Sequence, residues 1–277
     1  PLSAACMRVD GRGGCDMNVT GHTPMVRLLG PIDVLTASGP VAIGGHGRRA
    51  LVGALALRAG HAVPIDELSE VLWRDGPPAT AGNIIQSYVS HLRHEFGSRF
   101  IVLTDHSYEF DLEEVAIDAV VFEGLARRAY VLDDREEGLR CCRDALALWR
   151  GRPFGDLADD EYFELETYRL EALREAVMEL SLDIELHLGR HDLVVGELES
   201  AVREHPYNER LWFLLIEALA LGERRVEALR ACAELRRTLG SVGVEVGERI
   251  ARLEQQVLAG TTLTPEQIDH PGVSRRR

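Results

Sequence analysis

Lysine is absent from this chain of 277 residues, so all 31 of its basic residues are arginine. Without lysine the chain contains no P-loop of the Gly-x-x-x-x-Gly-Lys-Ser/Thr type, which excludes that class of nucleotide site. No stretch of about 18 residues is apolar and free of charge, so no membrane span is predicted. The N-terminal residues also lack a continuous apolar segment, and a signal peptide is therefore not expected.

The chain has five cysteines, an odd number without regular spacing, which is typical of reduced thiols in a cytoplasmic protein. Cys141 and Cys142 are adjacent and lack the spacer of a zinc-binding CxxC, so helix packing is expected there, with redox sensing as the alternative. His187 and His191 are four residues apart, but Gly189 lies between them and no carboxylate ligand accompanies them. We therefore expect no metal and no cofactor. No catalytic Ser–His–Asp or Cys–His arrangement can be assigned, so an enzyme is not expected.

The negative charge of the chain is concentrated in its second half. The chain has 45 acidic and 31 basic residues, a net charge of −14. Residues 26–112 contain 9 acids and 7 arginines (net −2), whereas residues 113–260 contain 32 acids and 19 arginines (net −13). An acidic half disfavours polyanions, whereas a nearly neutral half can bind one where its arginines cluster.

Residues 26–112 change from strand-like to helical periodicity and back. Short apolar runs bounded by Gly and Pro are typical of strands, and apolar residues spaced by three and four indicate helices. The predicted strands cover 26–29, 32–35, 41–43, 100–103 and 108–112, and the predicted helices cover 48–59, 65–73 and 81–96. This order of sheet, three helices and hairpin predicts an α+β winged helix-turn-helix domain, with Trp73 in its core.

Residues 113–260 are predicted to form a second, all-α domain. Apolar periodicity indicates helices at 118–131, 135–149, 161–188, 191–204, 208–221, 224–239 and 247–258. Two similar turns, Leu188-Gly189-Arg190-His191 and Leu221-Gly222-Glu223-Arg224, are offset by 33 residues, close to the repeat of about 34 in tetratricopeptide arrays. A tetratricopeptide-like array is the preferred interpretation, and an unrelated helical bundle is the alternative. Residues 1–25 and 261–277 are expected to be flexible tails.

The predicted helix at 81–96 has two different faces. An apolar stripe at helical spacing is formed by Ile85, Tyr88, Val89, Leu92 and Phe96. The other side carries amides, hydroxyls and basic groups: Asn83, Gln86, Ser87, Ser90, His91, Arg93 and His94. Asn and Gln can bond bidentately to adenine and Arg to guanine, and a helix of this length, about 24 Å, fits along a major groove. The face predicts a DNA recognition helix, and a solvated polar surface is the alternative.

Further candidate DNA contacts flank this helix. Arg48 and Arg49 open the first predicted helix, where backbone N–H groups also favour anions. Thr80 is a candidate N-cap for helix 81–96. The remaining candidates lie at the predicted hairpin tip: His106, Ser107 and Tyr108. A tip in this position is expected to reach a neighbouring groove or the DNA backbone.

Several motifs occur in a fixed order along residues 26–258. In the first half they are VRLLGPIDV from Val26, GHGRRAL from Gly45, Val71-Leu72-Trp73, Pro77-Pro78, QSYVSHLR from Gln86, and Tyr108. In the second half they are ALALWRG from Ala145, Leu188-Gly189-Arg190-His191, Glu204-His205-Pro206, and GVEVG from Gly243. Through these motifs the chain resembles the short type of the Streptomyces antibiotic regulatory protein (SARP) family.

The resemblance implies an OmpR-type winged helix-turn-helix followed by a tetratricopeptide-like bacterial transcriptional activator domain. Helix 81–96 would be the recognition helix and residues 100–112 the wing. The resemblance also implies a sequence-specific activator of a biosynthetic, secondary-metabolite gene cluster. Such regulators bind direct repeats in double-stranded DNA, which suggests a homodimer on DNA, and they recruit RNA polymerase holoenzyme through its sigma factor region. A cytoplasmic location follows.

The chain departs from the family pattern by having fewer fixed positive charges. His46-Gly47-Arg48-Arg49 stands where Pro-Lys-Gln-Arg is usual, and His91 and His94 stand where arginine is common. Asp105-His106-Ser107-Tyr108 replaces an Arg-Pro-Pro-Gly-Tyr wing. A protein with fewer positively charged side chains releases fewer counterions from DNA, which weakens its non-specific binding. Histidine does not replace arginine in this respect because it is mostly neutral at pH 7. We therefore expect modest affinity in a monomer and dependence on dimerisation or polymerase contact.

Two alternatives remain open at this point. The acidic run Asp159-Asp160-Glu161 is simplest as a solvated helix start, where acids favour the helix dipole, but it is also a candidate docking surface for basic parts of polymerase. The alternative function for the whole chain is a helical-repeat protein that binds a peptide or small ligand. In that case the winged domain would bind DNA weakly or not at all.

Overall fold

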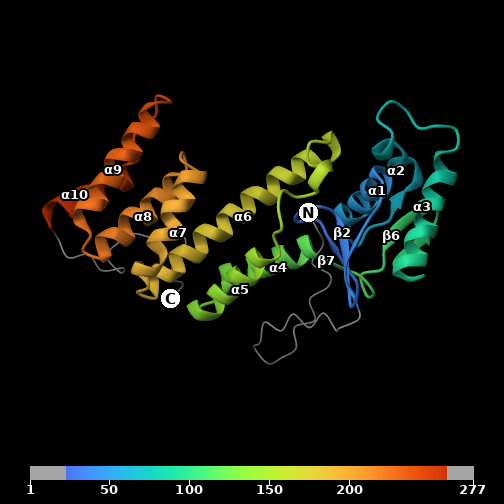
Figure 1. The fold of residues 1–277 in the computed structure, drawn as a ribbon, viewed down its shortest axis with the longest axis horizontal. Helices are drawn as coiled ribbons and strands as arrows, with labels where there is room; N and C mark the ends of the chain where they lie inside the picture. The colour runs from blue at the N-terminus through green and yellow to red at the C-terminus, as the bar shows by residue number, and fades with distance from the viewer. Residues whose placement is uncertain (1–22, 261–277) are drawn as a thin grey trace. The chain divides into compact units, whose positions relative to one another are not determined.

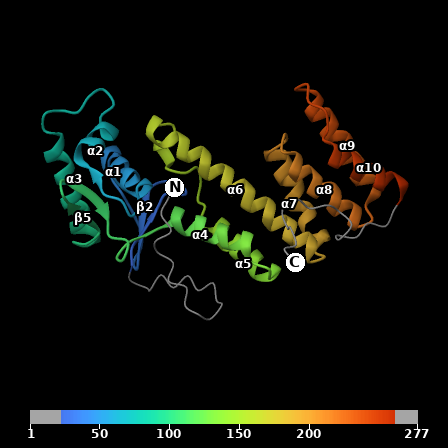
Figure 2. The same ribbon diagram turned by 180° about the vertical axis from the view of Figure 1, so that it is seen from behind.

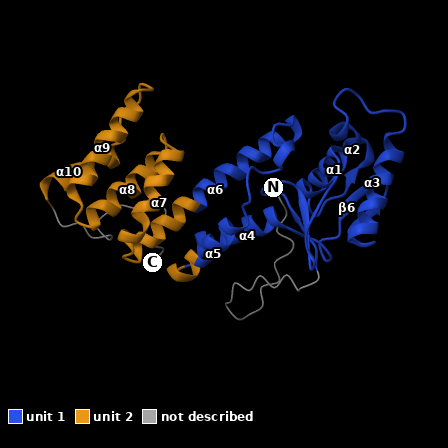
Figure 3. Cartoon of the chain, viewed as in Figure 1, with its two compact units in different colours: residues 1–132, 140–177 blue, residues 133–139, 178–277 orange. Residues whose placement is uncertain are grey.

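The computed structural model describes residues 23–260, which divide into two compact units. Unit 1 comprises residues 1–132 and 140–177, and unit 2 comprises 133–139 and 178–277, each as far as the described range extends (Figure 3). The predicted tails lie outside the described residues, apart from residues 23–25. Cys6 and Cys15 lie outside them as well.

Unit 1 contains a four-stranded sheet in the order β3-β2-β1-β7 (Figure 1). β1 (Met25–Arg27), β2 (Asp33–Thr36) and β3 (Gly39–Ala42) pair antiparallel, within two residues of the predicted ranges. β7 (Ala116–Ile117) is not predicted by the sequence; it pairs parallel with β1. Two residues carry too little pattern to identify a strand, so its pairing is decided by the tertiary structure.

Residues 26–112 of unit 1 are called the winged part, and three helices and a second sheet complete it. They are α1 (His46–Leu57), β4 (Val63–Pro64), α2 (Ile65–Leu72), α3 (Ala81–Phe96), β5 (Ile101–Thr104) and β6 (Ser107–Phe110). The predicted sequence of sheet, three helices and hairpin is confirmed, and α3 has the predicted bounds. β4, which is not predicted, pairs with β6 and so ties the hairpin to the start of α2.

The core of the winged part is built around α1. The seven residues from Ala50 to Ala56 are all buried, because neighbouring elements cover this helix on every side. At Gly53 a Cβ atom would lie 2.9 Å from Cε1 of Phe163, so the glycine makes room for that ring. The prediction that Trp73 is a core residue is wrong. Trp73 is half-buried, because it is the C-cap of α2 and leads into the exposed connection to α3.

Unit 1 continues into the helical half of the chain. It includes α4 (Asp118–Val131), most of α5 (Arg135–Ala147), the short 3-10 helix η1 (Gly155–Leu157) and the first part of α6 (Glu161–His187). The buried carboxylate of Asp118 accepts the backbone N–H groups of Leu28 at 2.7 Å and Leu29 at 3.1 Å. The predicted domain boundary at 112/113 lies where the sequence pattern changes from strand-like to helical. Unit 1 extends beyond that point because contacts such as these join the two parts. The boundary stays a prediction.

Unit 2 is an array of antiparallel helices around one apolar core. After the end of α6 come α7 (His191–Glu204), α8 (Glu209–Leu221), α9 (Arg225–Gly240) and α10 (Glu248–Ala259). α8 is buried continuously over nine residues, from Leu211 to Leu219, since α7, α9 and α10 pack around it. Asn208 caps α8, accepting the N–H groups of Arg210 and Leu211.

The repeat in unit 2 has a period of 34 residues in the structure. Gly189 and Glu223 both have positive φ, 75° and 59°, and each is followed by the N-cap of the next helix. Arg190 and Arg224, the two N-cap residues, also make equivalent backbone bonds to Glu185 and Leu219. The offset of 33 seen in the sequence is therefore one residue short, because it aligns Gly189 with Gly222 rather than with Glu223.

Candidate nucleic-acid interface

The helix α3 buries one side and exposes a polar side, as its sequence predicts. Ala81, Ile85, Val89 and Leu92 are buried, whereas Tyr88 and Phe96 at the margin of the stripe are half-buried. The exposed side chains are Asn83, Gln86, Ser87, Ser90, His91 and His94. In both views α3 lies at the edge of unit 1 farthest from α4 (Figures 1 and 2). The amides and hydroxyls of α3 are thus accessible to a duplex.

Arg93 differs from its neighbours on the polar side because it is half-buried. Its Nε donates a hydrogen bond of 2.7 Å to the carbonyl oxygen of Ile101 on β5. The guanidinium therefore connects the C-terminal half of α3 to the hairpin. A contact of Arg93 with a base stays a prediction, but Arg93 also holds the hairpin in place.

The hairpin formed by β5 and β6 ends in a two-residue turn. Thr104 pairs with Ser107, and the residues between them, Asp105 and His106, have φ of 45° and 61°. Positive φ at both positions is typical of a type I′ turn, and both side chains are exposed. The tip is therefore Asp105–His106, with Ser107 half-buried beside it.

Tyr108 does not lie on the surface of the hairpin. Only 4% of its surface is exposed, because it faces the core of the winged part from β6. Alternation of sides along a strand places Tyr108 and Phe110 inward. The prediction that Tyr108 contacts DNA from the tip is therefore wrong, whereas the predictions for His106 and Ser107 stay untested.

The start of α1 is occupied by contacts within unit 1. Arg49 forms a bidentate ion pair with Asp156 of η1, from Nε to Oδ1 at 3.1 Å and from Nη2 to Oδ2 at 2.6 Å. This pair holds the pKa of Asp156 below its usual value, chiefly through the hydrogen bonds from Arg49. Thr80 is the N-cap residue of α3, as predicted, but its side chain makes no capping hydrogen bond.

The winged part contains seven arginines, and six of them already bind acceptors within unit 1. Five form ion pairs, namely Arg27 with Asp33, Arg49 with Asp156, Arg58 with Glu67, Arg74 with Asp160 and Arg99 with Asp111. Arg93 donates to the Ile101 carbonyl. Among the described residues, none gives Arg48 an ion pair or a side-chain hydrogen bond. Little fixed positive charge is therefore available for DNA phosphates.

The acidic run at the start of α6 is more than a solvated helix start. Asp160 lies 3.3 Å from Nε of Arg74 and 3.8 Å from Nε2 of His46, and Asp159 binds Arg152 at 2.8 Å. The sequence gives no local sign of the two pairs made by Asp160, because Arg74 and His46 are far from it along the chain and only the fold brings them together.

Cys141 and Cys142 are buried, as expected of packing residues. Burial raises the pKa of the Cys142 thiol to about 12, so it stays protonated and unreactive at neutral pH. This disfavours the redox-sensing alternative. Within residues 23–260 no three His, Cys, Asp or Glu side chains are grouped so as to hold a metal ion. No helix in that range is long and apolar enough to cross a membrane.

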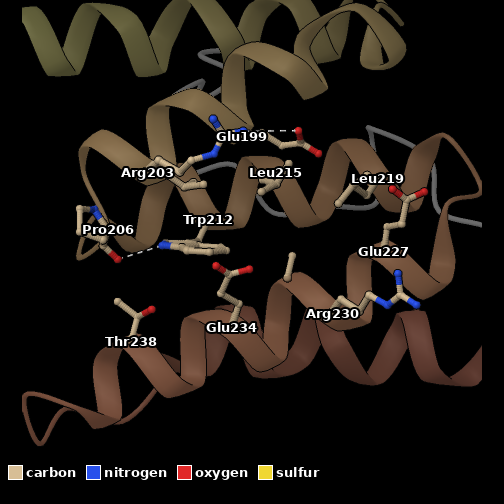
Figure 4. A pocket seen from close by; sticks show the side chains of 12 residues that line it. Glu199, Arg203, Pro206, Trp212, Leu215, Leu219, Glu227, Arg230, Glu234 and Thr238 are labelled. Atoms are coloured by element: carbon tan, nitrogen blue, oxygen red, sulfur yellow. Dashed lines mark hydrogen bonds and ion pairs between the residues drawn. The ribbon is translucent and has the colours of Figure 1, made fainter.

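Unit 2 has a groove between α7, α8 and α9 with a volume of about 360 Å³ (Figure 4). Trp212 lies at its centre and donates from Nε1 to the carbonyl oxygen of Pro206 at 2.9 Å. The side chains that line it include three acids and two arginines: Glu199, Arg203, Glu227, Arg230 and Glu234. The groove thus combines an apolar floor with a rim of both charge signs.

Residues 117–258 match the family model of the bacterial transcriptional activator domain. The chain is also 31% identical to the regulatory protein DnrI of Streptomyces peucetius, over 84% of this chain and 91% of DnrI. The chain belongs to the SARP family of transcriptional regulators. It is likewise 32% identical to the regulatory protein AfsR of Streptomyces griseus over 88% of this chain, but it spans only about a quarter of AfsR, 25%.

A solved structure of Mycobacterium tuberculosis EmbR, in complex with a low-affinity phosphopeptide, resembles this SARP-family chain. The TM-score is 0.78 at 27% identity, covering 88% of this chain and 67% of that one. The expected fold, an OmpR-type winged helix-turn-helix followed by an all-α, tetratricopeptide-like activator domain, is confirmed. As a SARP-family member the chain is a transcriptional regulator, and its relatives are regulators rather than enzymes.

Proposed function

We propose that this regulator is a sequence-specific DNA-binding activator, with α3 as the helix that enters the major groove. The exposed polar side of α3 is the observation that supports this most strongly, since it combines two amides with hydroxyls and carries no acid before Glu95. Asn83 and Gln86 have the groups that recognise adenine, and Ser87 and Ser90 can bond to a base or a phosphate. A DNA target would place the chain in the bacterial cytoplasm.

The wider role follows from family membership. We infer that the protein binds direct repeats as a homodimer, activates a biosynthetic, secondary-metabolite gene cluster and recruits RNA polymerase holoenzyme through its sigma factor region. The small number of available cations supports a dependence on partners, because few phosphate contacts give weak binding to DNA by one protomer. Two protomers on adjacent repeats would add their contacts on one face of the duplex.

The proposal is tested by selecting bound fragments from genomic DNA with the purified full chain and then measuring affinity for the enriched sequence. Enrichment of fragments with repeats about one helical turn apart is the expected result. The affinity for such a fragment should exceed that for a scrambled duplex by at least about 10³-fold. A chain that enriches no sequence at low salt contradicts the proposal.

A second candidate function is regulation through a bound peptide or small ligand, and the groove at Trp212 is the observation that favours it. Its apolar floor and charged rim are typical of sites that bind small molecules or peptides. Thermal unfolding of the chain in the presence of cell metabolites or peptide pools separates this function from DNA binding. A ligand of this groove raises the unfolding temperature, and Trp212→Ala abolishes the rise.

A further inference from the structure

Asp156 and Asp160 bind three basic side chains of the winged part. Asp156 forms the bidentate pair with Arg49, and Asp160 contacts Arg74 at 3.3 Å and His46 at 3.8 Å. The two acids are four positions apart, Asp156 in η1 and Asp160 directly before α6, and this segment lies within the activator-domain match. An element of the activator domain thus neutralises cations of the DNA-binding part.

These cations lie beside the proposed recognition helix. Gly47, between His46 and Arg49, is so close to α3 that a Cβ atom there would be 3.0 Å from the ring of Tyr88. Arg74 lies in the connection between α2 and α3, which runs directly into the first turn of α3. Cations in such positions are suited to bind the phosphates that border a major groove.

The chemistry of the two acids matches that of a phosphate. A guanidinium binds carboxylate and phosphate oxygens through the same planar, bidentate geometry, so the two anions compete for one arginine. We propose that Asp156 and Asp160 stand in for DNA phosphates within the free protein, so that a duplex must displace them from Arg49 and Arg74. The inference rests on the proposed DNA-binding function and adds a means by which the activator domain regulates it.

The segment is well placed for this role because its backbone is fixed, while the carboxylate of Asp156 is accessible and that of Asp160 is half-buried. Phe154 and Phe163, on either side of it, are buried with ring centroids 5.1 Å apart. A Cβ atom on Gly155 would lie 2.9 Å from Cα of Pro31, which shows how closely η1 packs on the loop after β1. The Asp156 side chain is nevertheless 54% exposed, so it can exchange its partner by rotation alone.

The test compares the full-length wild type with D156N/D160N on a random-sequence duplex of about three helical turns, at several salt concentrations. Each arginine released should tighten binding about two- to fivefold, the range of an exposed ion pair. The slope of log affinity against log salt should become steeper by about 0.9 for each phosphate gained. E161Q/E164Q removes the same number of charges from the adjoining first turn of α6 and is the matched control, because both side chains are exposed and the described residues give neither an ion pair.

A third variant connects the effect to one arginine. Arg49→Ala in the D156N background should remove most of the gain that D156N gives by itself. If wild type binds the duplex, and D156N/D160N binds it no more tightly than E161Q/E164Q does, this inference is overturned and the proposed function stands. Absence of binding by wild type and by D156N/D160N, with both chains folded by circular dichroism, would overturn both.

Discussion

Arg93 on α3 and Ile101 on β5 are joined by a hydrogen bond of 2.7 Å from the guanidinium Nε to the carbonyl oxygen. The bond fixes the hairpin against the helix that we propose to enter the major groove. Arg93 therefore has one role within the protein, which is to hold the hairpin, and a second, predicted role in contacting DNA. These roles can be separated because only one of them contributes to the stability of the free chain.

Arg93→Ala is expected to lower the free energy of unfolding by about 1.5–3 kcal/mol, because a partly buried charge-assisted bond is lost. If Arg93 reads a base, the same substitution should also weaken the free energy of binding to the selected DNA site by roughly 1–3 kcal/mol. Chemical denaturation and fluorescence anisotropy measure the two effects. An unchanged free energy of unfolding would show that the bond to Ile101 does not hold the hairpin.

Gln86→Ala should separate DNA recognition from stability. The side chain is exposed, so the free energy of unfolding should change by less than about 0.5 kcal/mol. Loss of a bidentate contact to adenine should weaken binding to the selected site by about 1–3 kcal/mol and relax the preference at one base pair. Ser98→Ala, an exposed change just beyond α3, is the control. Equal losses on selected and scrambled duplexes would argue against base recognition by Gln86.

The salt dependence of DNA binding by the wild type should be shallow. Six of the seven arginines in the winged part have partners within the protein, and Arg48 is the exception among the described residues. Arg48→Ala should reduce the slope of log affinity against log salt by about 0.9. Arg58→Ala removes the same charge from an existing pair with Glu67 and should leave the slope unchanged. A steep wild-type slope unaffected by Arg48→Ala would contradict this assignment.

The stability of the chain should depend on pH through Asp118. Burial raises the pKa of its carboxyl from 3.8 to about 6, against the backbone N–H groups of Leu28 and Leu29 and the charge of Arg150, which lower it. A carboxyl with a raised folded pKa binds its proton more tightly when folded. Its stabilising contribution is therefore complete below pH 3.8 and is lost as the pH rises to about 6.

Asp118→Asn removes this titration, and the Asn side chain keeps one of the two backbone bonds because its amide nitrogen cannot accept the other. The free energy of unfolding of wild type minus that of the variant should fall by about 3 kcal/mol across this window. Urea denaturation at a series of pH values measures the difference. Asp105→Asn, at the exposed hairpin tip, should run parallel to wild type. Parallel curves for Asp118→Asn as well would refute the raised pKa.

Two glycines inside helices should respond oppositely to alanine. In α1, Gly53→Ala places a methyl group 2.9 Å from the buried Phe163 ring and should destabilise the chain by about 1–3 kcal/mol. In α7, Gly196→Ala meets nothing within 4 Å and should stabilise it by up to about 1 kcal/mol through helix propensity. Thermal unfolding of both variants checks the prediction. Stabilisation by Gly53→Ala would mean that Phe163 moves without cost.

Local patterns in the sequence were sufficient where a short segment contains the whole signal. The bounds of α3 and the separation of its apolar and polar sides follow from one run of sixteen residues. The same local reasoning misplaced Tyr108, since the residues of a predicted strand do not by themselves reveal which of its two sides faces the core. It also missed β4 and β7, which are two residues long and are strands only because they pair with β6 and β1.

The helices, the polar side of α3 and membership of the regulator family could be predicted from the sequence alone, because periodicity and motif order are properties of neighbouring residues. Which cations remain available to DNA depends instead on the fold. Arg49 and Asp156 are 107 positions apart, and Asp118 is about 90 positions from the N–H groups it accepts. Ionic and polar partners at such separations are set by how the chain packs, and no local pattern encodes them.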